Sequence, residues 1–289
     1  AHSNPRIYNP FMPELPEVEV TRLGIAPHLE GRKVTAVKII DGRLRWPVPA
    51  SLSKSLPGQK VSAIERRGKY LLLEMDTGYL LIHLGMTGTL RVLPSSDPLK
   101  THDRVTLEFG KLSLRLHDPR KFGAVLWHPK SKGPIEKFTL LQKLGVEPFS
   151  PEFSGELGAE ILYQASRKRS VAVKQFLLAG QAVVGVGNIY CSESLFEAGI
   201  HPAKAAGKLT RPQCSRLANA VRLILKKAID AGGSSLKDFV NSDGDPGHFM
   251  VQTKVYDRKG LPCKVCKTPI SQIVQGQRST YFCPQCQKR

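Results

Sequence analysis

Val105-Thr-Leu-Glu-Phe-Gly-Lys-Leu-Ser-Leu-Arg-Leu116 is the stretch that decides the fold class of this chain. Apolar and polar residues alternate on both sides of Gly110-Lys111, which is the pattern of an antiparallel hairpin with a glycine-containing turn. Strands at short spacing, with little helix between them, predict an antiparallel β-sandwich or barrel over residues 13–135, of which we expect the sandwich. The other β-branched or alternating runs that support it lie at 34–40, 61–75, 79–92 and 124–128.

The pattern changes after Pro134, so we expect an α+β chain with a helical domain over 136–254. The clearest helix is predicted at 211–231, where Thr210 can cap an apolar stripe. Residues 241–248 are polar and glycine-rich and indicate a loop. Helical periodicity is also seen at 136–144, 155–168 and 171–179.

The charge of the chain points to a polyanionic partner. Its 289 residues include 43 Lys and Arg against 24 Asp and Glu, a formal net charge of +19. Nucleic acid is the simplest such partner, and a generic basic surface is the alternative. Apolar runs are too short for a membrane span, and residues 1–12 resemble an irregular leader or tag rather than a secretory signal. We expect a cytoplasmic, nucleoid-associated location of the bacterial type.

Four of the six cysteines form two Cys-x-x-Cys pairs near the C-terminus. Two such pairs can clamp one zinc ion between four thiolates, leaving no open position for water. The spacing predicts a structural zinc finger over 255–289, built on a hairpin, with four free thiols as the alternative. Arg278 lies between the pairs and is expected at the nucleic acid. The predicted ligands are Cys263, Cys266, Cys283 and Cys286.

Met12-Pro13-Glu14-Leu15-Pro16-Glu17-Val18-Glu19 is the candidate catalytic stretch. If the chain began at Pro13, its secondary amine could attack an electrophilic carbon and form an iminium ion. Glu14 could then donate a proton to the group that is displaced or opened. The alternative is an ordinary helix start, because proline and carboxylates are both favoured in a first helical turn.

Two further motifs have both a functional and a structural interpretation. The glycines of Val183-Val-Gly-Val-Gly-Asn-Ile-Tyr190 permit close backbone approach, and Asn188 can donate to a phosphate; alternatively the glycines only allow a tight helical turn. The run lacks the pattern of a dinucleotide site, so we expect no nucleotide cofactor. Asp118-Pro-Arg-Lys-Phe-Gly123 places a cation, Arg120, near an aromatic residue, Phe122, and the two could fill a gap in a base stack. The alternative is that Asp-Pro only begins a connection between strands.

Taken together, these motifs resemble the formamidopyrimidine-DNA glycosylase family. The stretch from Pro13 to Glu19, the Gly185–Tyr190 segment, the Asp118–Gly123 segment and the four-cysteine ribbon occur in the family's order, and the resemblance runs from Pro13 to the C-terminus. It implies a base-excision repair enzyme with a β-sandwich, a helix–two-turn–helix module and a zinc finger. Its partner would be damaged double-stranded DNA, and we expect a monomer.

The resemblance also implies roles for individual residues. Pro13 would attack C1′ of the damaged nucleotide, and Glu14 would assist opening of the sugar ring. Strand cleavage by β- and then δ-elimination would follow, on 8-oxoguanine and formamidopyrimidine lesions. Residues 241–252 would fold over the everted base. Lys69, near the lesion, and Arg278 are expected to be catalytic residues together with Pro13 and Glu14. Asn188 and Arg278 are expected on phosphates, and Met86, Arg120 and Phe122 in the hole left by the base. We expect DNA contacts also from His102, Lys121 and Tyr256.

Three departures from the family pattern stand out. Twelve residues precede Pro13, and while they are attached its nitrogen is a tertiary amide without a lone pair for attack. Asp257 stands where a glycine is expected, and Ala179-Gly180 replaces an acidic position. Two alternatives remain open. One is an endonuclease VIII-like enzyme for oxidised pyrimidines, and the other is a zinc-ribbon protein that binds lesions without cutting.

Overall fold

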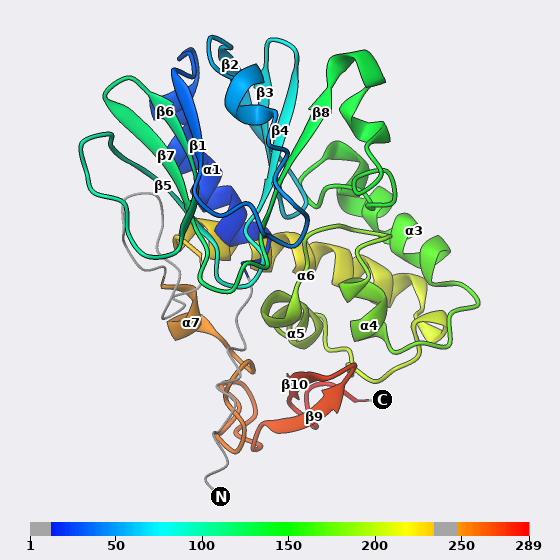
Figure 1. Cartoon of the computed structure of the whole chain (residues 1–289). Helices are drawn as coiled ribbons and strands as arrows, with labels where there is room; N and C mark the ends of the chain where they lie inside the picture. Colours follow the sequence, from blue (N-terminus) through cyan, green and yellow to red (C-terminus); the bar gives the residue numbers. More distant parts are fainter. Residues whose placement is uncertain (1–12, 234–247, 289) are drawn as a thin grey trace, which may run out of the picture. The chain divides into compact units, whose positions relative to one another are not determined.

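The structure is a computed structural model that describes residues 13–233 and 248–288 (Figure 1). The chain forms two compact units, which we describe separately. Among the described residues, the first contains Pro13 and Val20–Ser131, and the second contains Glu14–Glu19, 132–233 and 248–288. The expected leader and residues 241–247 of the expected lesion loop lie outside the described residues. The three-domain division stays a prediction.

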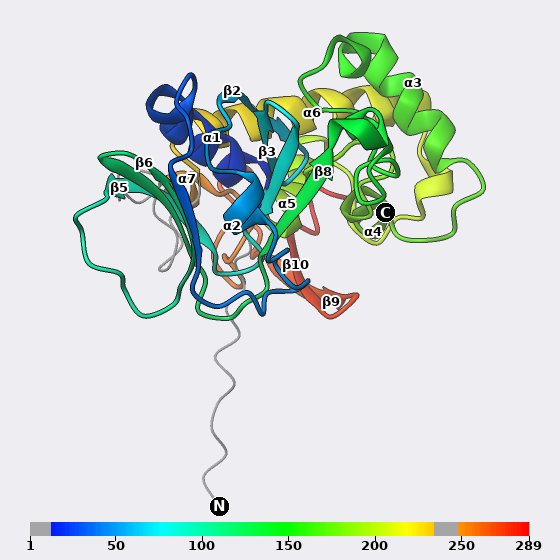
Figure 2. The same ribbon diagram turned by 45° about the horizontal axis from the view of Figure 1, so that its top comes forward.

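The first unit is the β-sandwich expected from the sequence. Two four-stranded antiparallel sheets face each other, one with strand order β1-β6-β7-β5 and the other with order β2-β3-β4-β8 (Figures 1 and 2). Their strands are β1 (Ala36–Ile39), β2 (Val61–Arg67), β3 (Tyr70–Met75), β4 (Gly78–His83), β5 (Thr89–Pro94), β6 (Asp103–Phe109), β7 (Leu112–His117) and β8 (Ala124–Pro129). The unit also contains α2 (Leu52–Ser55) and the 3-10 turn η1 (Lys130–Lys132).

The β6–β7 hairpin forms around the Gly110-Lys111 turn, as predicted. Phe109 pairs with Leu112 across Gly110, whose positive φ of 75° suits the turn. Leu107 and Leu114 are opposite one another in β6 and β7 and almost fully buried. The polar residues that alternate with them, Thr106 and Glu108 in β6 and Ser113 and Arg115 in β7, are also buried, so the alternation marks the pleat of the strands and not a solvent-exposed face.

Helices dominate the second unit. The long helix α6 begins with a capping box in which Thr210 and Gln213 each satisfy the other's backbone N–H, and its apolar stripe packs on α3 and α5. The helices are α1 (Leu15–Leu29), whose first residues belong to this unit, α3 (Gly155–Ser166), α4 (Val173–Leu178), α5 (Asn188–Glu197), α6 (Arg211–Asp230) and α7 (Phe249–Gln252). Short 3-10 turns lie at η2 (Ile135–Lys137), η3 (Pro151–Phe153) and η4 (Ala206–Lys208).

The helix predicted at 136–144 is wrong. After η2 the chain continues in turns, in which Leu141 N–H donates to the Phe138 carbonyl and Leu144 N–H donates to the Leu141 carbonyl, three residues back in each case. Val146 then pairs with Val183 in an isolated parallel bridge. This pairing makes the chain extended at Val146. The apolar run at 136–144 is therefore too short to form a stable α-helix before the chain becomes extended.

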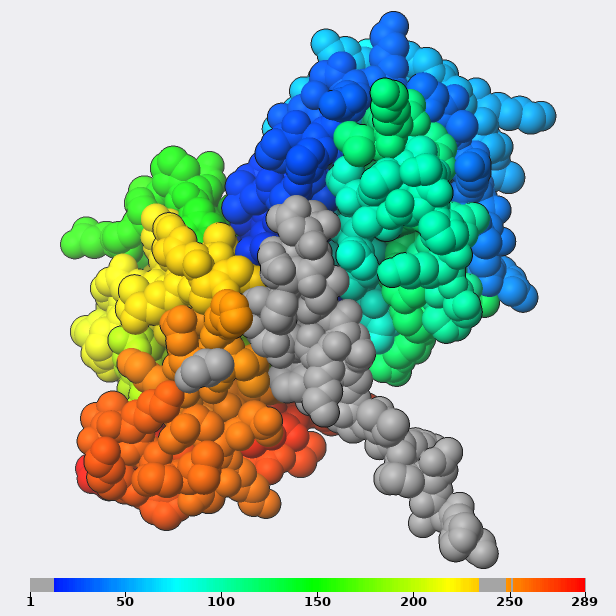
Figure 3. All heavy atoms as spheres, turned by 90° about the vertical axis from the view of Figure 1, so that its left-hand side faces the viewer, coloured from blue at the N-terminus to red at the C-terminus, as the bar shows by residue number. Residues whose placement is uncertain are grey.

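Residues 248 and 249 are hydrogen-bonded to the residues that follow α6. His248 N–H donates to the Ala231 carbonyl and Phe249 N–H to the Gly233 carbonyl, both at 3.0 Å. Figure 3 shows this neighbourhood as the yellow end of α6 beside the orange segment that begins α7. The C-terminal hairpin of β9 (Ser271–Gln275) and β10 (Arg278–Phe282) follows, as predicted.

No helix within residues 13–233 and 248–288 is long and apolar enough to cross a bilayer.

Candidate active site

Glu14 is held at the N-terminus of α5. Its side chain is buried, and its Oε1 accepts a hydrogen bond of 3.1 Å from the backbone N–H of Ile189. The first N–H groups of a helix have no partners within the helix, and they carry the positive end of its dipole. A carboxylate is therefore well accommodated there, and the N–H of Ile189 fixes its orientation.

The two glycines of the Gly185–Asn188 turn make room for this stretch. A Cβ on Gly187 would lie 2.0 Å from the Glu14 carboxyl carbon, and one on Gly185 would lie 2.4 Å from Cδ1 of Leu15. Leu15 N–H also donates to the Gly185 carbonyl at 3.3 Å. The close approach predicted from the glycines is present, and the group approached is the chain's own Glu14-Leu15 segment.

Glu17 also orients the Glu14-Leu15 segment. One of its carboxylate oxygens accepts from the Glu14 N–H at 2.9 Å, and the other accepts from the Tyr190 hydroxyl at 2.5 Å. Glu17 thus closes the first turn of α1 in the manner of a capping box and ties it to α5. Glu17, three residues after Glu14, therefore binds the backbone N–H of Glu14.

Asn188 and Tyr256, both expected to contact DNA, lie together. The Asn188 side-chain amide donates to the Tyr256 hydroxyl at 3.3 Å. Burial raises the pKa of Tyr256, so this hydroxyl stays protonated at neutral pH. The sequence singled both residues out, although no pattern indicated that they would touch.

Glu193 fixes the backbone of this Tyr256 segment and was not identified from the sequence. Its buried carboxylate accepts from the N–H groups of Lys254, Val255 and Tyr256, at 2.8–2.9 Å. Burial raises the pKa of Glu193, and the three N–H groups oppose that rise. Asp257 follows with a φ of 57°, a left-handed conformation that aspartate tolerates better than most residues. This explains why aspartate can stand where glycine is expected.

Lys174 is a second buried charge that the sequence did not reveal. Its ammonium donates to the Thr280 hydroxyl at 2.7 Å and to the Ser279 carbonyl at 3.0 Å. Burial lowers the pKa of Lys174 to about 8. It therefore anchors the start of β10, where Arg278 is exposed immediately after the Gly276-Gln277 turn.

In the β-sandwich unit, the turns that carry Met86 and Phe122 are joined. The buried Asp118 carboxylate accepts from the Thr87 hydroxyl at 2.9 Å and from the Gly123 N–H at 2.8 Å, so it ties the residue after Met86 to the residue after Phe122. A Cβ on Gly85 would lie 2.4 Å from the Phe122 carbonyl carbon. The expected wedge residues of the two turns therefore occupy one site.

The exposed side chains of this site are aromatic and cationic. The Arg120 guanidinium lies over the Phe122 ring, 4.8 Å from its centroid, and Phe122 is 42% exposed. His83 donates no proton through Nδ1, because that atom accepts from the Gly85 N–H at 3.0 Å. Burial, and then the nearby charge of Lys69, lowers the pKa of His83 to about 4.

His102 and Lys121, the remaining expected DNA contacts of this unit, both have positive φ, 79° and 61°. The His102 Nδ1 lies 3.0 Å from the Arg104 guanidinium, and the Lys121 ammonium lies 2.6 Å from the Asp41 carboxylate. Each is therefore engaged within the protein.

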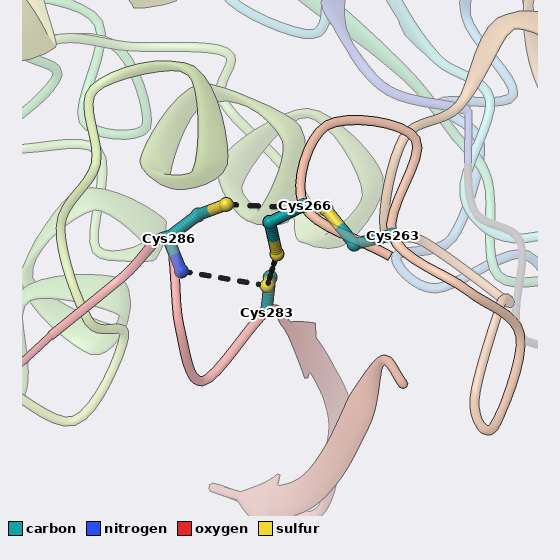
Figure 4. A group of neighbouring side chains, drawn as sticks. All are labelled: Cys263, Cys266, Cys283 and Cys286. Atoms are coloured by element: carbon teal, nitrogen blue, oxygen red, sulfur yellow. Dashed lines mark hydrogen bonds between the residues drawn. The ribbon is translucent and has the colours of Figure 1, made fainter. Parts of the chain in front are cut away.

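The four cysteines of the C-terminal ribbon converge on one point (Figure 4). Their sulfurs all lie within 4.8 Å of one another, with 3.9 Å between Cys263 and Cys286 and 3.4 Å between Cys266 and Cys283. Sulfurs on a tetrahedral zinc, with Zn–S bonds of about 2.3 Å, are separated by about 3.8 Å. The residues therefore fit a zinc ion and need no rearrangement of the two loops.

Family models match three successive parts of the chain. The formamidopyrimidine-DNA glycosylase N-terminal domain matches residues 12–125, the formamidopyrimidine-DNA glycosylase H2TH domain matches 144–240, and a zinc finger found in FPG and IleRS matches 260–289. The chain belongs to the formamidopyrimidine-DNA glycosylase family. Membership makes it a DNA glycosylase of base excision repair with one structural zinc, as the resemblance implied.

Relatives and solved structures agree. The formamidopyrimidine-DNA glycosylase of Polynucleobacter necessarius subsp. necessarius is 94% identical over 278 residues, which cover 96% of this chain and all of the relative. A Lactococcus lactis Fpg variant in complex with a Fapy-dG containing DNA has a TM-score of 0.88 at 32% identity, and MutM in complex with carbocyclic 8-oxo-G containing DNA has 0.86 at 33%. Each alignment covers 96% of this chain and 100% of the solved chain.

Proposed function

We propose that this enzyme excises oxidised purines, 8-oxoguanine and formamidopyrimidines, from duplex DNA and then cleaves the strand, with Pro13 as nucleophile and Glu14 as acid. The observation that carries the proposal is the placement of the buried Glu14 carboxylate, adjacent to Pro13 and oriented by the N–H of Ile189. Support comes also from the solved relatives, which were bound to DNA containing these lesions.

The chemistry follows from a secondary amine beside a carboxyl group. The Pro13 nitrogen forms a bond to C1′ of the nucleotide while the bond from C1′ to the base breaks, and the base leaves with the proton that the amine gives up. Glu14 gives a proton to the ring oxygen as the C1′–O4′ bond opens, which leaves an iminium ion. The iminium makes the 2′ proton acidic. Its loss expels the 3′ phosphate, and a second elimination expels the 5′ phosphate.

The remaining residues bind and shape the DNA. Arg278 and the pair of Asn188 and Tyr256 grip phosphates, together with Lys69. Met86, Arg120 and Phe122 enter the base stack, because a flat aromatic ring and a guanidinium both replace lost stacking well. We further infer that the enzyme acts as a monomer and without a nucleotide cofactor. We infer that it works in the cytoplasm, on the DNA of the nucleoid. Light scattering of the purified protein, alone and with a duplex, tests the monomer.

Borohydride trapping tests the nucleophile. Protein trimmed to begin at Pro13 should form a covalent adduct with a duplex carrying 8-oxoguanine opposite cytosine, and the adduct should map to Pro13. The control is the same protein with the twelve preceding residues attached, because they convert the Pro13 amine into an amide that cannot attack. It should bind without being trapped. Tight binding by the trimmed protein without an adduct would favour a lesion-binding protein, and preference for an oxidised pyrimidine would favour the endonuclease VIII-like alternative.

Salt should weaken DNA binding steeply. A protein that neutralises about six phosphates is expected to lose roughly a thousandfold in affinity between about 50 and 200 mM monovalent salt, because bound counterions are released from the DNA. Fluorescence anisotropy with an undamaged duplex measures the slope, and circular dichroism over the same range checks that the fold is unchanged. A flat response would contradict binding through phosphates.

A further inference from the structure

Two residues outside the motifs, Arg104 and Asp41, bracket the turn that carries Arg120 and Phe122. Arg104 lies on β6, and Asp41 follows β1, the neighbouring strand of the same sheet (Figure 1). The Asp41 N–H donates to the Arg104 carbonyl at 3.2 Å, so the sheet itself brings the two side chains together. They lie 3.4 Å apart as an ion pair.

Arg104 holds the start of the turn. Its buried guanidinium donates to the Asp118 carbonyl at 2.8 Å and to the Pro119 carbonyl at 3.3 Å, the two carbonyls that immediately precede Arg120. A charged donor on a neutral carbonyl makes a strong hydrogen bond, and it is stronger where water is excluded. Arg104 thus fixes the backbone from which the Arg120 side chain extends.

Asp41 holds the middle of the turn. Its carboxylate lies 2.6 Å from the Lys121 ammonium and also accepts from Arg43 and Arg104. The hydrogen bonds from Arg43 and Lys121 keep the pKa of Asp41 well below its usual range. Lys121 is in the left-handed region, which a residue with a Cβ occupies only when its surroundings compensate the strain. The ion pair with Asp41 is such a compensation.

We infer that Arg104 and Asp41 are positioning residues, which hold the Asp118–Phe122 turn so that Arg120 and Phe122 meet the DNA already in their inserted geometry. In this arrangement the Lys121 ammonium binds Asp41 and not the DNA, and Lys121 affects DNA binding only by holding the turn in place. The inference rests on the proposed function of Arg120 and Phe122 as a wedge in the base stack.

The experiment compares two reactions of one enzyme, trimmed to begin at Pro13. Excision of 8-oxoguanine requires a base to be evicted from the stack, whereas cleavage at a preformed abasic site does not. Arg104→Met should lower single-turnover excision by about tenfold or more, the scale of losing charge-assisted hydrogen bonds, and leave abasic-site cleavage within about twofold. Asp41→Asn should show the same selective loss to a smaller degree, and Arg104→Lys should partly restore excision.

Arg115→Met is the matched control. Arg115 is another buried arginine of the same sheet, but it donates to the Pro94, Asp97 and Pro98 carbonyls of a different loop. It should lower the melting temperature without changing the ratio of the two rates. 2-Aminopurine placed opposite the lesion reports wedge insertion directly, and its fluorescence rise on binding should be smaller for Arg104→Met than for Arg115→Met.

The outcomes separate this inference from the proposed function. Equal loss of both reactions in Arg104→Met, together with a lower melting temperature, would show a general structural role and overturn the inference. Unchanged excision and unchanged fluorescence would also overturn it. If the unsubstituted enzyme cleaves neither substrate, the proposed function itself fails.

Discussion

Gly187→Ala is expected to abolish base excision. The added Cβ would lie 2.0 Å from the Glu14 carboxyl carbon and 2.4 Å from each of its oxygens, well inside van der Waals contact. Glu14 cannot shift freely, because its N–H is bonded to Glu17 and the next residue packs on Gly185. The acid must therefore leave the N-terminus of α5. We expect single-turnover excision to fall by about a hundredfold or more, and stability to fall by about 1–3 kcal/mol from overpacking.

A double-mutant cycle separates the clash from a general defect. Glu14→Ala removes the group that the new Cβ would meet, so Gly187→Ala should cost little stability in that background. Glu14→Gln keeps the shape of the side chain and should lose excision with little change in melting temperature. If Gly187→Ala retained wild-type excision, Glu14 would not act from the position described here.

Much of the fold could be predicted because its signals are local. The alternation on both sides of Gly110 depends only on neighbouring residues and the period of a strand, and it gave the β6–β7 hairpin. The four cysteines are similarly informative, since metal-ligand spacing is set by the size of one small loop. The 136–144 segment shows the limit of such reasoning, because the Val146–Val183 bridge that redirects it lies in a distant part of the chain.

The supports of the candidate site could not be predicted, because their partners are far away in sequence. Glu193 binds backbone groups 61–63 residues later, and Lys174 binds a hydroxyl 106 residues later. Nothing in a local pattern distinguishes such a carboxylate or ammonium from a solvated surface charge. The signal that could have identified Glu193 is weak: it lies in α5, whose neighbouring residues are almost all apolar or small. A charge in a helix with so few exposed positions must find a buried partner.

The motif glycines illustrate an intermediate case. The sequence correctly indicated close backbone approach at Gly185 and Gly187, because only a missing Cβ gives that freedom. It did not indicate which group approaches. The structure identifies that group as the Glu14-Leu15 segment, and thereby connects two motifs that lie about 170 residues apart.

Removing zinc is expected to abolish DNA binding while most of the helical unit stays folded. Burial in the β9–β10 hairpin is uneven: Val274 of β9 is 72% exposed, whereas Tyr281 and Phe282 of β10 are buried and β10 contacts α5. A two-stranded hairpin by itself is marginal in water, so we expect its fold to depend on the metal. Without the metal the hairpin should unfold and Arg278 should lose its fixed position. We expect a loss of affinity for duplex DNA of about a hundredfold or more, measured by anisotropy after chelation, with zinc release followed by a metal-sensitive dye.

Two cysteine variants make this result specific to the metal. Cys266→Ser removes one ligand and should reproduce the effect of chelation without any chelator present. Cys214→Ser is the matched control, since Cys214 is buried in α6 and distant in sequence from the four ligands. It should retain zinc and DNA binding, with at most a lower melting temperature. Because α6 buries its apolar stripe on α3 and α5, its helical signal should persist after zinc loss. Unchanged DNA affinity once zinc release is verified would show that Arg278 and its hairpin do not hold the DNA.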